Sequence, residues 1–193
     1  MEKDYKLDRR KKRTRQLLKN ALISLLTEKD FHSITVQDIT NLADVNRATF
    51  YSHYHDKHDF FQQLIDDILN EFEGIFVQYT ERKDPKDLEP KPYDLIVCAF
   101  QHFKHNADFY NVMLSPKGVP GFYGKLNGII HAAADRRRVR LQIDASQLAV
   151  PQDIMNSYIS SVFLGVIIQW LKNEMPYTSE YMAKKLTYIL LRK

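Results

Sequence analysis

Apolar residues recur at helical spacing along most of the chain, and the gaps between these runs divide it into segments. The first third predicts three helices: one from Asp8, as its cap, to about Glu28, a short one after Thr35, and another from Arg47 to about His55. Within each run the apolar positions lie three or four residues apart, which places them on one side of a helix. These three helices are expected to share one small core.

The remainder of the chain continues the same pattern. Charged residues, proline and glycine interrupt it at Glu81–Pro92 and Pro116–Gly121, where helices are expected to end. No segment shows the alternation typical of a strand. The sequence therefore predicts an all-α fold of about nine helices, the last six over residues 57–76, 93–106, 108–114, 122 to about 141, 151–173 and 179–191.

The segment 151–173 differs from the others because its apolar residues surround the helix. Such a helix is buried on more than one side, and one domain covers only one of them. Small residues recur there at every fourth position, which would let a second helix approach closely. We expect a helix-to-helix dimer contact at Ser157, Ser161, Gly165, Ile168, Met182, Leu186 and Ile189.

Composition and charge indicate the class of protein. Among 193 residues, 44% are apolar, 27% are charged and only 6 are Gly, which is typical of a folded helical protein. The net charge is +4, and basic residues concentrate between Lys3 and Lys19. A single cysteine, Cys98, cannot form an intramolecular disulfide, and no signal or membrane-spanning segment is predicted. A cytoplasmic protein is expected.

The stretch after Ser33 has the features of a helix-turn-helix. Thr35 and Asp38 can cap the first short helix, and Asn46 can cap the second after a tight polar turn. The second helix exposes a guanidinium, several hydroxyls and an imidazole, with no carboxylate. These groups suit base edges and phosphates in the major groove of DNA.

These residues resemble the DNA-binding domain of TetR-family transcriptional regulators. The resemblance covers the first third of the chain and rests on Ile34-Thr35-Val36, Asp38-Ile39, Ala43, Val45, Arg47, Thr49-Phe50-Tyr51, His53-Tyr54 and Lys57. The chain departs from the family at Asp44, usually glycine, and at Asn46, often serine. Together with the chemistry above, the resemblance implies DNA-binding roles for Thr35, Gln37, Asn46, Arg47, Ala48, Thr49, Tyr51, His53 and Lys57.

The same resemblance implies two domains, a helix-turn-helix domain over residues 1–56 and an effector-binding and dimerisation domain over 57–193. The second domain is loosely similar to regulators of the dihydroxyacetone kinase operon type. Family members pair through their last two helices and usually hold a small-molecule pocket. Most aromatic residues of this half are core, but a pocket could be lined by Phe100, Phe103, Tyr110, Met113, Phe122, Tyr123, Tyr158, Phe163 and Trp170.

Other functions have weaker support. His53, His55 and His58 straddle a helix end with no cysteine nearby, so no metal site is expected. Asp135 and the arginines that follow it are interpreted as a solvated helix end, with an anion site as the alternative. No phosphate loop, nucleophile motif or carboxylate pair suggests an enzyme or a cofactor. A membrane-surface role for the basic N-terminus does not explain the capped turn that follows it.

The function expected from the sequence is a homodimeric regulator that binds a roughly palindromic operator in double-stranded DNA. A repressor released by an unknown small-molecule effector is the leading form. A transcriptional activator or a constitutive DNA binder of the same fold is the alternative.

Overall fold

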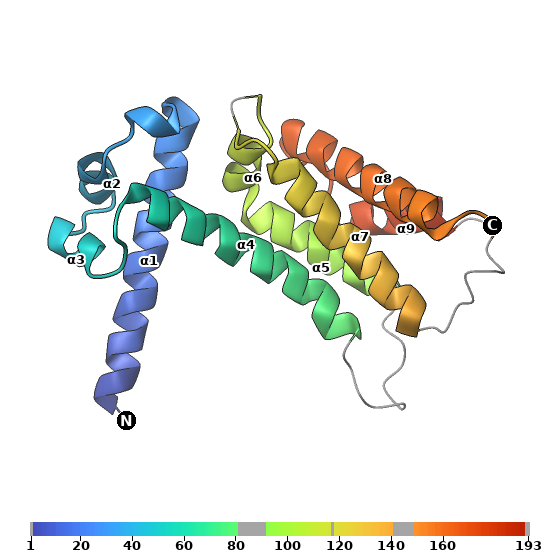
Figure 1. Cartoon of the computed structure of the whole chain (residues 1–193), viewed down its shortest axis with the longest axis horizontal. Coiled ribbons are helices and arrows are strands. Elements are labelled where there is room, and N and C mark those ends of the chain that lie inside the picture. Colours follow the sequence, from blue (N-terminus) through green and yellow to red (C-terminus); the bar gives the residue numbers. More distant parts are fainter. Residues whose placement is uncertain (1, 81–91, 117, 141–148, 192–193) are drawn as a thin grey trace. The chain divides into compact units, whose positions relative to one another are not determined.

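The computed structural model describes residues 2–80, 92–116, 118–140 and 149–191, and all regular elements in these ranges are helices (Figure 1). They comprise nine α-helices and one short 3-10 helix. The expected all-α fold is confirmed. The expected interruption at 81–91, the residue 117 in the second interruption and the expected helix end near Leu141 lie outside the described residues.

The chain divides into two compact units, Met1–Asp67 and Ile68–Lys193. The division falls inside α4 (Lys57–Thr80), so this single helix contributes residues to both units. The functional boundary expected after residue 56 is a different kind of division, and it stays a prediction.

The first unit is built from α1 (Glu2–Glu28), the 3-10 helix η1 (Phe31–Ser33), α2 (Val36–Leu42), α3 (Arg47–Tyr51) and the first part of α4. Each helix turns its apolar side inward, as the spacing predicted. The residues with no exposed surface are Leu18, Leu22, Ile34, Ile39 and Phe50. Because they come from α1, α2, α3 and the segment after η1, one core holds all of these elements together.

The start of α1 differs from the expectation. The helix begins at Glu2, so Asp8 lies inside it and is not its cap. Residues 2–15 contain no glycine or proline and are rich in Lys and Arg, both of which favour helix.

The end of α3 also differs. We expected the helix to reach about His55, but it ends at Tyr51, with Ser52 as its C-cap. The cause lies in the next helix: the Asp56 carboxylate accepts hydrogen bonds from the amides of His58 and Asp59 at 2.7 and 2.8 Å. Those contacts cap the start of α4 and require an irregular connection before it.

Asp44, the departure from the family's glycine, has a left-handed backbone with φ of 52°. It lies in the turn between α2 and α3, where the Asp44 amide donates to the Asn41 carbonyl at 3.2 Å. Aspartate tolerates this conformation better than most residues do. The substitution therefore keeps the tight turn.

Lys57, the first residue of α4, forms hydrogen bonds with the backbone of the segment before α2. Its Nζ donates to the carbonyl oxygens of Phe31, His32 and Ile34 at 3.1, 2.9 and 2.7 Å. It also lies 5.0 Å from the centre of the Phe31 ring. An ammonium group has three protons, so these three carbonyls use its full donor capacity.

The second unit contains the rest of α4 with α5 (Pro92–His105), α6 (Ala107–Met113), α7 (Phe122–Arg140), α8 (Gln152–Lys172) and α9 (Ser179–Leu191). Helix α5 packs against α9, and α7 packs against α8 (Figure 1). The core is strongly aromatic. Its most deeply buried rings are Phe72, Phe100, Phe103, Phe109, Tyr110 and Phe122.

Helix α8 is long and apolar enough, by length and composition, to meet the criterion for a membrane-spanning helix. The core helix of a globular protein meets the same criterion, and 39% of the apolar window is buried within this fold. The interruptions by serine and glycine, and the packing against α7, fit a helix that serves as core on one side.

The Lys57 contacts lead to a prediction about stability. Lys57→Met keeps the apolar stem but leaves three carbonyls without their charged donor, so the free energy of unfolding should fall by about 1–3 kcal/mol. Urea denaturation followed by circular dichroism measures this loss, and hydrogen exchange should localise it to η1 and α2. Lys29→Met removes the same charge from an exposed position and is the control. Equal losses in both variants would reduce the effect to net charge.

Candidate nucleic-acid interface

The first turn of α2 is fixed by a reciprocal cap between Thr35 and Asp38. The Asp38 amide donates to the Thr35 hydroxyl oxygen at 3.1 Å, and the Thr35 amide donates to the Asp38 carboxylate at 2.9 Å. The Thr35 amide and, at 2.8 Å, the Thr35 hydroxyl both donate to the Asp38 carboxylate, and these two bonds lower the pKa of Asp38 because they favour its charged form. The cap holds Thr35 and Gln37 exposed at the start of α2.

The start of α3 is capped in the same way. The Asn46 side-chain oxygen accepts a hydrogen bond from the Ala48 amide at 2.8 Å. Asparagine thus supplies the capping chemistry that serine often provides in the family. Arg47 and Ala48 are exposed and Thr49 is half-buried, so the leading end of α3 presents a guanidinium and two methyl groups.

One side of α3 is anchored, and this leaves the other side free. Phe50 has no exposed surface, and Tyr54, just after the helix, is 6% exposed. Their rings lie 5.4 Å apart, and Phe60 of α4 contacts both at 5.6 and 4.5 Å between ring centres. The aromatic cluster fixes which side of α3 faces outward.

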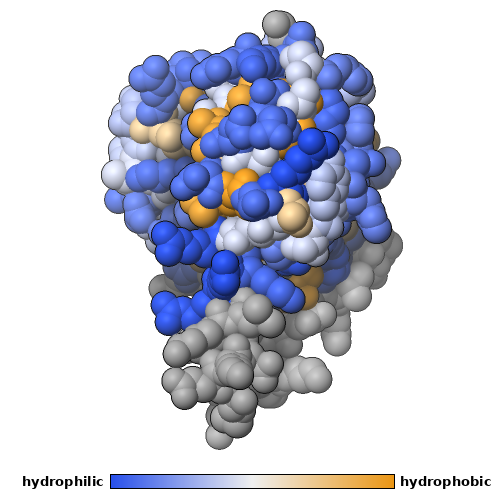
Figure 2. Space-filling model, turned by 90° about the vertical axis from the view of Figure 1, so that its left-hand side faces the viewer, coloured by the Kyte–Doolittle hydropathy of each residue, from blue (hydrophilic) through white to orange (hydrophobic). Residues whose placement is uncertain are grey.

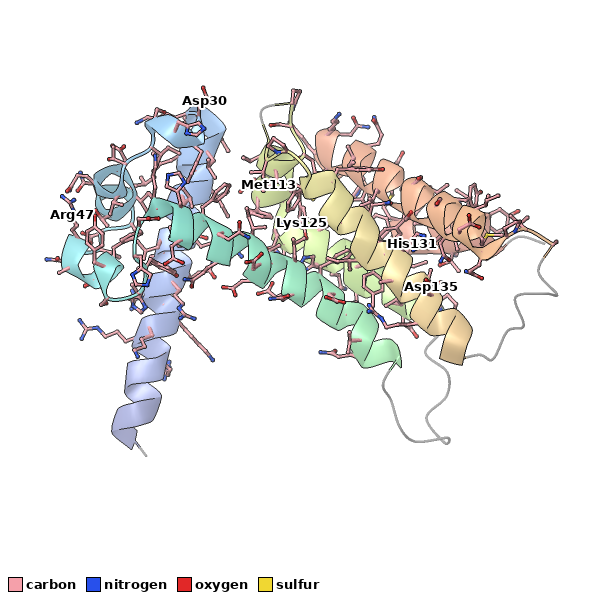
Figure 3. The ribbon with its side chains drawn as sticks, in the orientation of Figure 1. Asp30, Arg47, Met113, Lys125, His131 and Asp135 are labelled. Atoms are coloured by element: carbon pink, nitrogen blue, oxygen red, sulfur yellow. The ribbon has the colours of Figure 1, made fainter. Side chains whose placement is uncertain are left out.

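The outward side carries the predicted DNA-reading residues. The Arg47 Nη2 atom lies 3.3 Å from the Tyr51 hydroxyl, and the guanidinium carbon lies 5.5 Å from the centre of the Tyr51 ring. Figure 3 shows Arg47 pointing away from α1 and α4. The contact orders the long arginine side chain along α3 while most of its donors remain available.

His53 connects this surface to the basic part of α1. It is half-buried, and burial lowers its pKa, with the positive charges of Arg15 and Lys11 adding to the effect. The two basic residues are therefore close enough to act on the imidazole. About forty residues separate His53 from this basic run, so no spacing rule predicts their proximity from the sequence.

The surface around α2 and α3 is mostly hydrophilic, as Figure 2 shows from the side that carries these helices. Its exposed large apolar residues include Leu42 and Tyr51. Thr35 caps α2 and Gln37 lies in its first turn, and α2 packs on α3. Lys57 is different: its donors are directed to backbone carbonyls inside the unit.

The expected dimer residues occupy different environments. Ser157, Ser161 and Gly165 are exposed on α8, and Ile189 is exposed on α9. Ile168 and Met182 are half-buried. Leu186 is buried in the core of its own unit, so it is not available on the surface of a single chain.

Most expected ligand-lining residues are core residues. The buried ones are Phe100, Phe103, Tyr110, Met113, Phe122, Phe163 and Trp170, whereas Tyr123 and Tyr158 are exposed. The Trp170 indole donates to the Tyr177 carbonyl at 3.0 Å. His102 Nε2 lies 2.8 Å from the Tyr110 hydroxyl, and burial raises the pKa of Tyr110. This pair is a polar contact within an aromatic core.

The histidines at the interface do not form a metal cluster in the described part of the chain. No group of three His, Cys, Asp or Glu side chains there is arranged to hold a metal ion. His55 and His58 are exposed, and the His58 amide is used in the cap of α4.

Comparison with known proteins identifies relatives of both parts of the chain. Residues 19–64 match the family model of bacterial regulatory proteins of the tetR family, and residues 90–192 match the model of a transcriptional regulator C-terminal region. The chain is 25% identical over 190 residues to an uncharacterised HTH-type transcriptional regulator, YxbF, of Bacillus subtilis strain 168. That match covers 98% of this chain and 47% of YxbF, so the chain spans about half the length of this relative.

Two solved structures have similar folds. A TetR transcriptional regulator from Streptococcus agalactiae 2603V is 28% identical with a TM-score of 0.60, and the match covers 98% of this chain and 99% of that one. The dihydroxyacetone kinase operon activator DhaS is 15% identical with a TM-score of 0.61, covering 92% and 94%, and shows likeness of fold. With both family models matched in chain order, the protein belongs to the TetR family of transcriptional regulators.

Proposed function

We propose that the protein is a homodimeric, sequence-specific DNA-binding regulator whose α3 reads the major groove. The observation that carries this proposal is the outward side of α3, a capped helix start with exposed Arg47, Ala48 and Tyr51 and no carboxylate. The protein is proposed to bind double-stranded DNA in the cytoplasm. We propose no catalytic role and no cofactor for it.

The residues of the interface divide into base readers and phosphate contacts. Arg47 has the fork geometry that pairs with a guanine edge, and the Ala48 and Thr49 methyl groups suit thymine. Thr35 and Gln37 at the start of α2, Asn46 and Tyr51 beside Arg47 in sequence or contact, and His53 suit phosphates or flanking bases. The exposed basic residues of α1 extend the positive surface along the DNA backbone.

Lys57 has a different role in this proposal. Its three proton donors are already bound to carbonyls, so it acts mainly by positioning the segment that leads into Thr35. Its positive charge still adds to the attraction for DNA. A family-matching lysine can therefore support binding without a direct phosphate bond.

A substitution at Arg47 tests the base-reading role. Arg47→Ala should cost about 1–3 kcal/mol on the cognate site and relax the preference at one base position. The measurement is binding-site selection from random DNA, followed by fluorescence anisotropy on the selected sites over a range of salt concentrations.

The matched comparison is Lys11→Ala, which removes an exposed charge from α1. It should weaken binding to all sequences alike and reduce the salt slope by about one. If Arg47→Ala weakens all sequences uniformly and keeps the selected motif, another residue reads the base.

The dimer is proposed to form through the exposed sides of α8 and α9. Ile154 and Tyr158 on α8 are 55% and 52% exposed, and the small residues Ser161 and Gly165 continue the same side of the helix. On α9, Ile189 is also exposed. Contiguous exposed apolar surface marks an interaction site, and a two-fold pairing fits a palindromic operator.

Gly165 offers a clean test because a Cβ atom at this position meets nothing within 4 Å inside the chain. Gly165→Leu should leave the protomer folded, since leucine favours helix more than glycine does, yet it should separate the paired helices. Analytical ultracentrifugation should then show a monomer, and operator affinity should fall.

The control for this experiment is Gly128→Leu on α7. Gly128 is also exposed, and a Cβ atom there also meets nothing within 4 Å. This variant should remain a dimer. A dimeric Gly165→Leu variant with normal operator binding would place the interface elsewhere.

We further propose that a small molecule bound in the second unit releases the regulator from DNA, with activation by the effector as the alternative. Helix α4 supports this idea because it begins with the Lys57 anchor in the first unit and continues into the aromatic core of the second, where Phe72 and Phe76 are buried. A coupling of about 1–3 kcal/mol would change DNA affinity about 5- to 150-fold.

Linkage provides the test of regulation. An effector that shifts DNA affinity must bind free and operator-bound protein with different dissociation constants. Calorimetric titration of each hit from a metabolite library into both forms measures this difference. Equal constants for every compound that binds would leave a constitutive DNA binder.

A further inference from the structure

Arg136, near the end of α7, has a guanidinium group with only some of its hydrogen-bond donors paired. Its Nη1 lies 3.2 Å from the Glu73 Oε1 atom of α4. Its Nε and Nη2 atoms are buried, and neither has a hydrogen-bond partner in the described structure. These two atoms form one edge of the guanidinium, with two parallel N–H donors.

A buried edge of this kind is costly for the fold. Buried donors without acceptors lose their hydration and regain nothing, and the loss is larger for a charged group. The same edge is well suited to a carboxylate, which accepts two parallel hydrogen bonds from it. Among the residues that the structure describes, no acceptor is hydrogen-bonded to this edge, so it can take one from a ligand.

The neighbouring polar residues are directed elsewhere. Asp135 accepts a hydrogen bond at its Oδ1 from the Asn156 amide at 2.8 Å, and Asn156 in turn accepts one from Gln152. Asn156 is buried, so this network joins α7 to α8 inside the unit. Figure 3 places Asp135 near the C-terminal end of α7. Asp135 and Glu73 each have a defined partner already.

We propose that the Nε and Nη2 edge of Arg136 binds the carboxylate of a small monocarboxylic acid, and that this acid is the effector. The inference deepens the proposed ligand-responsive function and rests on it for the word effector. Two nearby carboxylates, Glu73 and Asp135, repel a doubly charged phosphate more than a singly charged carboxylate. The site therefore favours a monoanion.

The site also has a route to regulation within the second unit. Glu73 belongs to α4, and Arg136 belongs to α7, so the ion pair links these two helices. A bound carboxylate shares the guanidinium with Glu73 and weakens that link. Binding at Arg136 thereby changes how α7 holds α4.

The test uses the full chain without DNA. Calorimetry and thermal denaturation are performed with hexanoate and benzoate, with their uncharged amides hexanamide and benzamide, and with inorganic phosphate. We expect the acids to bind and raise the melting temperature, and the amides and phosphate to bind at least about tenfold more weakly.

Three variants assign the binding to Arg136. Arg136→Gln should weaken carboxylate binding at least about tenfold, whereas Lys125→Gln, which removes an exposed charge from the same helix, should not. Glu73→Gln should strengthen binding, because it removes the competing carboxylate. Arg136→Met should lose carboxylate binding without lowering the melting temperature of the free protein, because it also removes the unpaired donors.

The opposite results overturn the proposal. Equal binding of acids and amides, or unchanged carboxylate binding in Arg136→Gln, excludes this site. A lower melting temperature in Arg136→Met with carboxylate binding intact assigns Arg136 a structural role. None of these results concerns operator binding, so the proposed DNA-binding function does not depend on them. Carboxylate binding that is equal in free and operator-bound protein would keep the site but remove its effector role.

Discussion

The interface depends on a constraint of length: α3 has only five residues, too few to be stable as a helix alone. Its conformation comes from its surroundings, namely the Asn46 cap at one end and the burial of Phe50 beneath it. Phe60 of α4 packs against Phe50, so the start of α4 also helps to hold α3. The first unit thus supports one short exposed helix, and a loss of packing in this unit would disturb the side of α3 that is proposed to read DNA.

Local features of this support could be predicted from the sequence. The reciprocal cap of Thr35 and Asp38, the cap at Asn46 and the left-handed turn at Asp44 involve residues a few positions apart, and short-range rules describe such contacts. The predicted end of α3, near His55, was wrong because Asp56 caps the start of α4 and an irregular connection precedes it. The sequence analysis predicted the start of α4 at Lys57 correctly but did not identify Asp56 as its cap.

Contacts between distant residues could not be predicted in the same way. Lys57 reaches carbonyls 23 to 26 residues earlier, a partnership that no spacing rule contains. The family resemblance, together with its residue type, predicted a DNA-binding role for it. The same limit applies to the aromatic residues that were expected to line a ligand pocket. Their number predicted an aromatic core, but only the three-dimensional structure shows that Tyr110 is buried and Tyr158 is exposed. Periodicity specifies the side of a helix, and packing decides what that side meets.

The two arginines singled out by this structure show how environment sets the role of one side chain. Arg47 is exposed, so water satisfies its unused donors, and it keeps them available for a base edge at little cost. In Arg136 two donors are buried, and water cannot satisfy them equally well. An exposed fork suits a partner that arrives with its own surface, such as the groove of DNA. A buried fork suits a small anion that enters and replaces the missing acceptor.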